Sequence, residues 1–168
     1  LQILGRYPQA RRTLETAQQV LTQQPDSPLK GHALQTLGNV LRRTADRDTA
    51  TAVLTEALTL AENRRDEAAI AALQISLGDT AQAAGDGETA LEAYQVAAAA
   101  ATTPLTRVTA QLRQLALYLD RGETAIAQTL WPETLPLLDA LPPGRPSVSA
   151  RIELGRALID LVASDPAA

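Results

Sequence analysis

The chain has 168 residues, a formal net charge of −4, no Cys, Met or Phe, and a hydrophobic share of 45% with only 2% aromatic residues. This length suits one ordinary domain with a buried core, and a core built on Ala and Leu favours closely packed helices over a β-sandwich. The acidic charge argues against nucleic acid and anionic membranes as partners, and the lack of Cys excludes disulfides and thiolate chemistry. We therefore expect an all-α protein.

The chain begins at Leu1 and contains no Met, so we expect it to be a piece of a longer protein. No stretch has the character of a signal peptide, and no apolar run approaches the length of a transmembrane helix. These observations predict a cytoplasmic protein without a membrane partner.

Apolar residues recur with the period of an α-helix along most of the chain. The expected helices lie near residues 7–23, 28–44, 47–63, 66–84, 87–102, 104–120, 123–140 and 147–163. Residues 1–4 resemble the end of an earlier helix. Pro132 and Pro136 each remove a backbone donor, so we expect them to break or kink the seventh helix. The segment 141–146, which is rich in Pro, is the one predicted loop.

Helix starts carry capping residues. Ser27 and Thr103 each place a hydroxyl before a proline, which suits the first position of a helix. Asp46, Asp66 and Asp86 are expected to cap three further helices. The predicted boundaries therefore rest on local chemistry as well as on periodicity.

The sequence repeats itself at a spacing of 40 residues. Ala10, Leu14 and Ala17 are followed at this spacing by Ala50, Leu54 and Ala57, and then by Ala90, Tyr94 and Ala97. The dipeptide Leu37-Gly38 recurs at the same spacing as Leu77-Gly78. Matches in register in two different helices indicate a repeat made of helix pairs.

This pattern of small and large residues resembles the tetratricopeptide-repeat family. In that family the small residues let paired helices touch, and the large residue fills the gap beside them. The resemblance implies a right-handed α-solenoid of antiparallel helical hairpins. The spacing here exceeds the family's usual 34 residues, which implies slightly longer helices.

The third unit departs from the family pattern. Arg113 stands where Gly is expected, and Thr129 and Pro132 stand where an aromatic residue and an Ala are expected. We expect one solenoid over residues 1–168, with a distorted third unit. Its predicted parts are a partial repeat at 1–26, repeats at 27–65, 66–103 and 104–140, and a partial repeat at 146–163.

The long repeats, the Pro-Pro turn at 142–143 and the helix that follows it are similar to a second group of sequences. These are the regions upstream of caspase-like CHAT peptidase domains in large bacterial proteins, especially cyanobacterial ones. The similarity concerns the longer protein and implies no chemistry in this segment.

The sequence lacks the residues that a catalytic site or a metal site would require. The single histidine, His32, has no Cys to pair with, and no Gly-x-Ser-x-Gly motif is present. The spacing of the acidic residues provides no cluster of metal ligands. We expect no enzymatic activity, no cofactor, no metal and no small-molecule substrate.

The family resemblance implies that the first helix of each pair lines a concave groove. The residues carried over to this groove are His32, Gln35, Thr36, Asn39, Arg43, Ala72, Ile75, Ser76, Asp79, Gln82, Arg107, Ala110, Gln111, Gln114 and Tyr118. Amide, Arg and Tyr side chains can form adaptable hydrogen bonds with an extended or helical peptide. Chaperone-binding members use a Lys-Asn-Asn-Lys-Arg carboxylate clamp, of which only Asn39 and Arg107 fit here, so we do not expect a cochaperone.

The sequence favours a module that binds a protein or peptide segment, as a regulatory arm of a larger protein. Two alternatives remain open. Pentatricopeptide repeats are also helical hairpins and bind RNA, although the acidic charge and the few cations of the groove argue against this function. A structural spacer or self-association arm is the other alternative.

Overall fold

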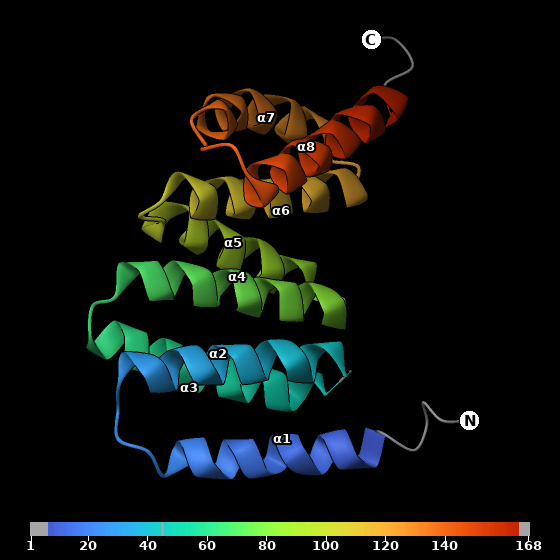
Figure 1. Cartoon of the computed structure of the whole chain (residues 1–168). Helices are drawn as coiled ribbons and strands as arrows, with labels where there is room; N and C mark the ends of the chain where they lie inside the picture. Colours follow the sequence, from blue (N-terminus) through green and yellow to red (C-terminus); the bar gives the residue numbers. More distant parts are fainter. Residues whose placement is uncertain (1–6, 45, 165–168) are drawn as a thin grey trace.

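The computed structural model describes residues 7–44 and 46–164, and this part of the chain consists of α-helices joined by short turns. The helices are α1 (Tyr7–Thr22), α2 (Pro28–Arg43), α3 (Arg47–Asn63), α4 (Glu67–Ala84), α5 (Gly87–Ala100), α6 (Pro104–Asp120), α7 (Thr124–Asp139) and α8 (Arg145–Ser164). They stack in chain order, from α1 at one end to α7 and α8 at the other (Figure 1). This arrangement confirms the prediction of an all-α helical-repeat solenoid. The helix end expected at residues 1–4 lies outside the described residues.

The predicted capping residues are confirmed. The hydroxyl groups of Ser27 and Thr103 accept hydrogen bonds from backbone N–H groups three residues later, at 3.1 and 3.2 Å, and a proline follows each of them. Asp46, Asp66 and Asp86 cap α3, α4 and α5 in the same way. These bonds satisfy donors that have no partner within a helix, which fixes where each helix begins.

The prolines of α7 do not break it, so of the two expected effects, a break or a kink, the break is wrong. Helix α7 runs without interruption from Thr124 to Asp139, with Pro132 and Pro136 inside it. Both prolines are exposed, and they are four residues apart on the outer side of the helix. The carbonyl groups that lose a partner therefore lie near solvent, where water can replace the missing donors.

The predicted loop is shorter than expected, because α8 begins at Arg145. Pro146 then occupies the first turn, where a missing N–H group leaves no helical bond unmade. The Ser147 hydroxyl accepts a hydrogen bond from the Gly144 N–H at 3.2 Å, and this contact ties the loop to the start of the helix. The expected loop of residues 141–146 therefore ends two residues early.

The core lies between successive helices rather than at one centre. Leu34, Leu37 and Leu41 of α2 form one cluster with residues of α3 and with Leu73 of α4. A second cluster joins α6 and α7 to one side of α8, which includes Leu154. Neighbouring helices thus bury each other's apolar faces, as expected for a repeat protein.

The small residues of the repeat lie where helices make close contact. Ala50, Ala57, Ala90 and Ala97 have no exposed surface. A Cβ atom added to Gly38 would lie only 2.5 Å from Cγ of Leu54 in the next helix. The predicted role of the small and large residues is confirmed for α2 and α3, because no larger residue would fit at position 38 without movement.

Candidate functional site

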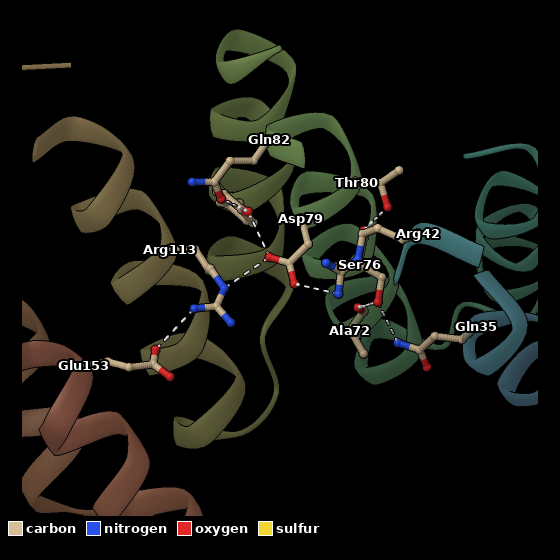
Figure 2. A network of polar contacts seen from close by, with 10 residues as sticks. Gln35, Arg42, Ala72, Ser76, Asp79, Thr80, Gln82, Arg113 and Glu153 are labelled. Carbon is tan, nitrogen blue, oxygen red and sulfur yellow. Dashed lines mark hydrogen bonds and ion pairs between the residues drawn. The ribbon is translucent and has the colours of Figure 1, made fainter. Parts of the chain in front are cut away.

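Polar side chains link four helices along one side of the stack. Helices α2, α4, α6 and α8 lie next to one another in that order, and each contributes at least one residue to a connected set of hydrogen bonds and ion pairs. Figure 2 shows this set, with Asp79 of α4 near its centre. We name the side formed by α2, α4 and α6 the α2–α4–α6 face.

Asp79 joins three helices. Its Oδ2 atom lies 3.7 Å from Nη2 of Arg42 in α2, and its Oδ1 atom accepts a hydrogen bond from Nε of Arg113 in α6 at 3.1 Å. The side chain of Asp79 is 19% exposed, so these charges are only partly screened by water. The carboxylate therefore connects three successive first helices electrostatically (Figure 2).

Tyr94 of α5 contributes a hydroxyl to the same centre. This hydroxyl lies 2.9 Å from both Oδ1 of Asp79 and Oε1 of Gln82, and it can donate its one proton to only one of them at a time. Burial raises the pKa of Tyr94, and the negative charge of Asp79 raises it further. Tyr94 therefore remains a neutral donor under ordinary conditions.

Arg113 extends the connection to the last helix. Its Nη1 atom donates to Oε2 of Glu153 in α8 at 3.2 Å, while its Nε atom contacts Asp79. One guanidinium thus joins carboxylates from α4 and α8. The residue that breaks the family pattern in the sequence is the one that connects these two helices.

The predicted groove residues of α2 differ in their surroundings. His32 and Arg43 are exposed, whereas Gln35 and Asn39 are half-buried. The Nε2 atom of Gln35 donates to Oγ of Ser76 in α4 at 3.3 Å. The structure thus brings Gln35 against the neighbouring helix and leaves His32 and Arg43 open to solvent.

The predicted residues of α4 and α6 range from exposed to buried, and several of them are half-buried. Ile75, Gln82 and Gln111 have this intermediate exposure, and Gln82 contacts Tyr94 as described above. Arg107 is exposed, and its guanidinium donates to the Ala101 carbonyl at 3.1 Å. The Oε1 atom of Gln111 is buried and has no hydrogen-bond partner within the described part of the chain.

Four residues predicted for the groove are buried instead, and one of them is Ser76 of α4. Gln114 is 7% exposed and donates to the Tyr94 carbonyl at 3.1 Å, and Tyr118 is 8% exposed within the core shared with α7 and α8. Ala110 is also buried. These side chains point into the packing between helices, so they cannot reach a ligand on the open face.

Sequence reasoning missed Arg42, Arg113 and Glu153. The 40-residue spacing could have identified the first of them, because it places Arg42 in register with Gln82, whereas the neighbouring Arg43 was chosen. Arg113 was noticed only as a departure from Gly. Nothing in the sequence indicates its contact with Glu153, since that contact depends on how α8 packs against α6.

The described residues contain no helix that is both long and apolar enough to cross a membrane. This observation concerns only the helices of the structure.

Comparison with known proteins gives one match. Residues 1–63 match a family model described as Tetratricopeptide repeat. No curated protein and no solved structure matches the chain significantly. The matched segment covers α1, α2 and α3, which include the close contact between Gly38 and Leu54. Residues 1–63 are therefore similar to the tetratricopeptide-repeat family, and the helix pairs that follow them continue the same helical-repeat solenoid.

Proposed function

We propose that the α2–α4–α6 face binds a segment of another protein, and that the chain serves as a regulatory arm of a larger protein. Tetratricopeptide repeats generally mediate protein–protein interactions, and they are typically scaffolds rather than enzymes. The observation that supports this site is the polar connection of α2, α4 and α6 through Asp79. It fixes three neighbouring helices beside one another, so their side chains can contact a single extended ligand.

The face retains polar groups that a peptide can use. Arg43 and His32 are exposed, and Asn39 is half-buried beside them on α2. On α6, Gln111 is half-buried, and its side-chain amide carries both a donor and an acceptor group. Backbone groups of a bound segment would thus find both donors and acceptors on this face.

Asp79 has a positioning role in this proposal. Its carboxylate is already in contact with Arg42, Arg113 and Tyr94, so it is not free to pair with a cation of the ligand. A ligand would therefore make its direct contacts with residues around this centre. Replacing Asp79 would therefore test whether the three helices must be held beside one another for binding, and not whether Asp79 itself contacts the ligand.

Binding to an identified partner segment tests the proposal. Partners are captured from the source cell, the bound segment is mapped, and its affinity is measured by calorimetry for the variants Asn39→Ala, Arg43→Glu and Gln111→Ala. Loss of one hydrogen bond to a charged group typically costs about 1.5–3 kcal/mol, which is at least a tenfold loss of affinity for Arg43→Glu. The neutral contacts of Asn39 and Gln111 should each contribute less.

Glu92→Lys on α5 is the matched control, because Glu92 is exposed and lies on a helix outside the proposed face. If Glu92→Lys abolishes binding while the three variants of the face do not, the partner docks on another side and the proposed face is wrong.

A further inference from the structure

A cavity of about 430 Å³ lies at one end of the α2–α4–α6 face. Its walls come from the first two turns of α2 and α4 and from the turn between α3 and α4. Gly31, Ala68, Ala69 and Ala72 line it, and their small side chains leave the space open. The volume lies within the range of small ligand pockets, and it is large enough for one side chain of a partner.

Arg64 is a charged residue of this cavity, and two of its donor atoms have no partner in the part of the chain that the structure describes. Its Nε and Nη1 atoms are buried and have no hydrogen-bond partner among the residues that the structure describes. Its Nη2 atom lies 3.1 Å from the position that a Cβ atom would take at Gly31, so the guanidinium rests against the backbone of α2. Arg64 as a whole is half-buried, and unpaired donors are costly, so an acceptor that enters the cavity beside this guanidinium is favoured.

The other polar groups of the cavity are partly engaged. Asp66 accepts a hydrogen bond from the backbone N–H of Ala69 at 3.0 Å, so its carboxylate serves the start of α4. The amide of Gln35 donates to Ser76, and His32 is exposed at the rim. The positive ends of α2 and α4 also lie at this cavity, and they favour a negative group there.

We propose that this cavity receives the carboxylate of an Asp or Glu side chain from the protein segment that binds the α2–α4–α6 face. A carboxylate supplies acceptors and the charge opposite to that of Arg64, and charge-assisted hydrogen bonds are about twice as strong as neutral ones. The inference rests on the proposed function, because it assigns one contact of the ligand to one end of the same face. It also predicts that partner segments carry an acidic residue near one end.

The test uses defined probes rather than an unidentified partner. The probes are the peptide acetyl-Ala-Ala-Glu-Ala-Ala-amide, the same peptide with Gln in place of Glu, and inorganic phosphate. Amide chemical shifts of the protein are followed during titration at low salt. We expect saturable shifts at residues around the cavity with the Glu peptide, at dissociation constants on the order of millimolar. The Gln peptide should give no saturable shifts there.

Two adjacent arginines provide a matched pair of variants. Arg64→Gln removes the guanidinium from the cavity and should lower the affinity for the Glu peptide at least tenfold. Arg65→Gln removes the same charge from an exposed neighbour outside the cavity lining, and it should leave the affinity nearly unchanged. Ala68→Leu fills the cavity from an exposed position, so it should also weaken binding without removing any charge.

Each other outcome overturns the inference. Absence of saturable shifts with the Glu peptide, or equal losses in Arg64→Gln and Arg65→Gln, would show that the cavity is not a carboxylate site. Binding of phosphate but not of the Glu peptide would identify an inorganic anion as the occupant instead. The proposed function fails separately, if variants of Asn39, Arg43 and Gln111 leave the affinity for the full partner unchanged.

Discussion

Gly78 of α4 lies directly against the ring of Tyr94 in α5. A Cβ atom added at position 78 would lie 2.5 Å from Cε1 and 2.7 Å from Cδ1 of this ring. The ring has no exposed surface, and its hydroxyl is held near Asp79 and Gln82. The packing around the ring and the hydrogen bonds of its hydroxyl hold it in place. The ring therefore cannot easily move to make room for a larger residue at position 78.

Gly78→Ala should therefore destabilise the protein, even though Ala is the better helix former. We expect a loss of about 1–3 kcal/mol in the free energy of unfolding, because overpacking exceeds the gain in helix propensity. Denaturant unfolding followed by circular dichroism measures this change.

Gly155→Ala is the control for this prediction. Gly155 of α8 stands in the same Leu-Gly dipeptide, but nothing lies within 4 Å of its hypothetical Cβ atom. The same substitution should stabilise the protein there by about 0.5–1 kcal/mol. Changes of the same sign at both positions would contradict the role assigned to the Tyr94 ring.

The alanines of the repeat give a second prediction on packing. Ala50→Leu and Ala90→Leu should each cost about 1–3 kcal/mol of unfolding free energy, since both residues are completely buried between helices. Ala99→Leu, at an exposed position of α5, should change stability by less than about 0.5 kcal/mol. Equal losses at all three positions in thermal or chemical unfolding would show that the repeat register is wrong.

The sequence allowed most of the fold to be predicted, because its signals are local. The caps Ser27 and Asp66 and the recurring Leu-Gly dipeptides fixed the helix starts and the close contacts between paired helices. The continuity of α7 could not be predicted in this way. A proline indicates a break, but whether the helix continues depends on the exposure of Pro132 and Pro136 in the folded stack.

The candidate site could be predicted from the sequence less completely than the fold. The repeat places Gln35 and Asp79 on the correct helices, but it does not indicate that both side chains contact the neighbouring first helix. It does not distinguish an open side of a helix from the side that packs against the next unit. Gln114 and Tyr118 were for this reason expected on the groove, although both are buried.

Tyr94 makes the stability of the protein depend on alkaline pH. Its pKa is raised in the folded state by burial and by Asp79, so the folded protein holds the phenolic proton more tightly than the unfolded chain does. This contribution is fully present below the unfolded pKa of about 10, and it is lost as the pH rises above that value. We expect the melting temperature of the wild-type protein to fall between about pH 9 and pH 11.

The variant Tyr94→Phe separates the alkaline loss of stability due to Tyr94 from the losses due to other titrating groups. At neutral pH the variant should be less stable by about 0.5–1.5 kcal/mol, because Asp79 and Gln82 lose the hydroxyl. The stability difference between wild type and variant should shrink as the pH rises, because the phenol at position 94 ionises in the unfolded wild-type chain while the folded protein keeps the proton, and the variant has no such phenol. A difference that stays constant through pH 11 in thermal unfolding would contradict the assignment.

The final prediction compares the two carboxylates that pair with Arg113, which belong to Asp79 and Glu153. Asp79 is 19% exposed and contacts two arginines and a tyrosine hydroxyl, whereas Glu153 is 39% exposed and forms an ion pair with Arg113. Asp79→Asn should cost about 1–3 kcal/mol of unfolding free energy, since two partly buried guanidinium groups lose their shared charge. Glu153→Gln removes one exposed ion pair and should cost at most about 1 kcal/mol.

Ionic strength distinguishes these two contributions further. Salt screens exposed charges more strongly than partly buried ones, so the loss in Glu153→Gln should nearly vanish at 1 M NaCl while most of the loss in Asp79→Asn persists. Chemical unfolding by urea at low and high NaCl measures both values without adding charge through the denaturant. Equal losses in the two variants, or an Asp79→Asn loss that disappears in salt, would show that Asp79 does not hold α2, α4 and α6 together. The proposed binding face would then lack its support, since its three helices are linked through this carboxylate.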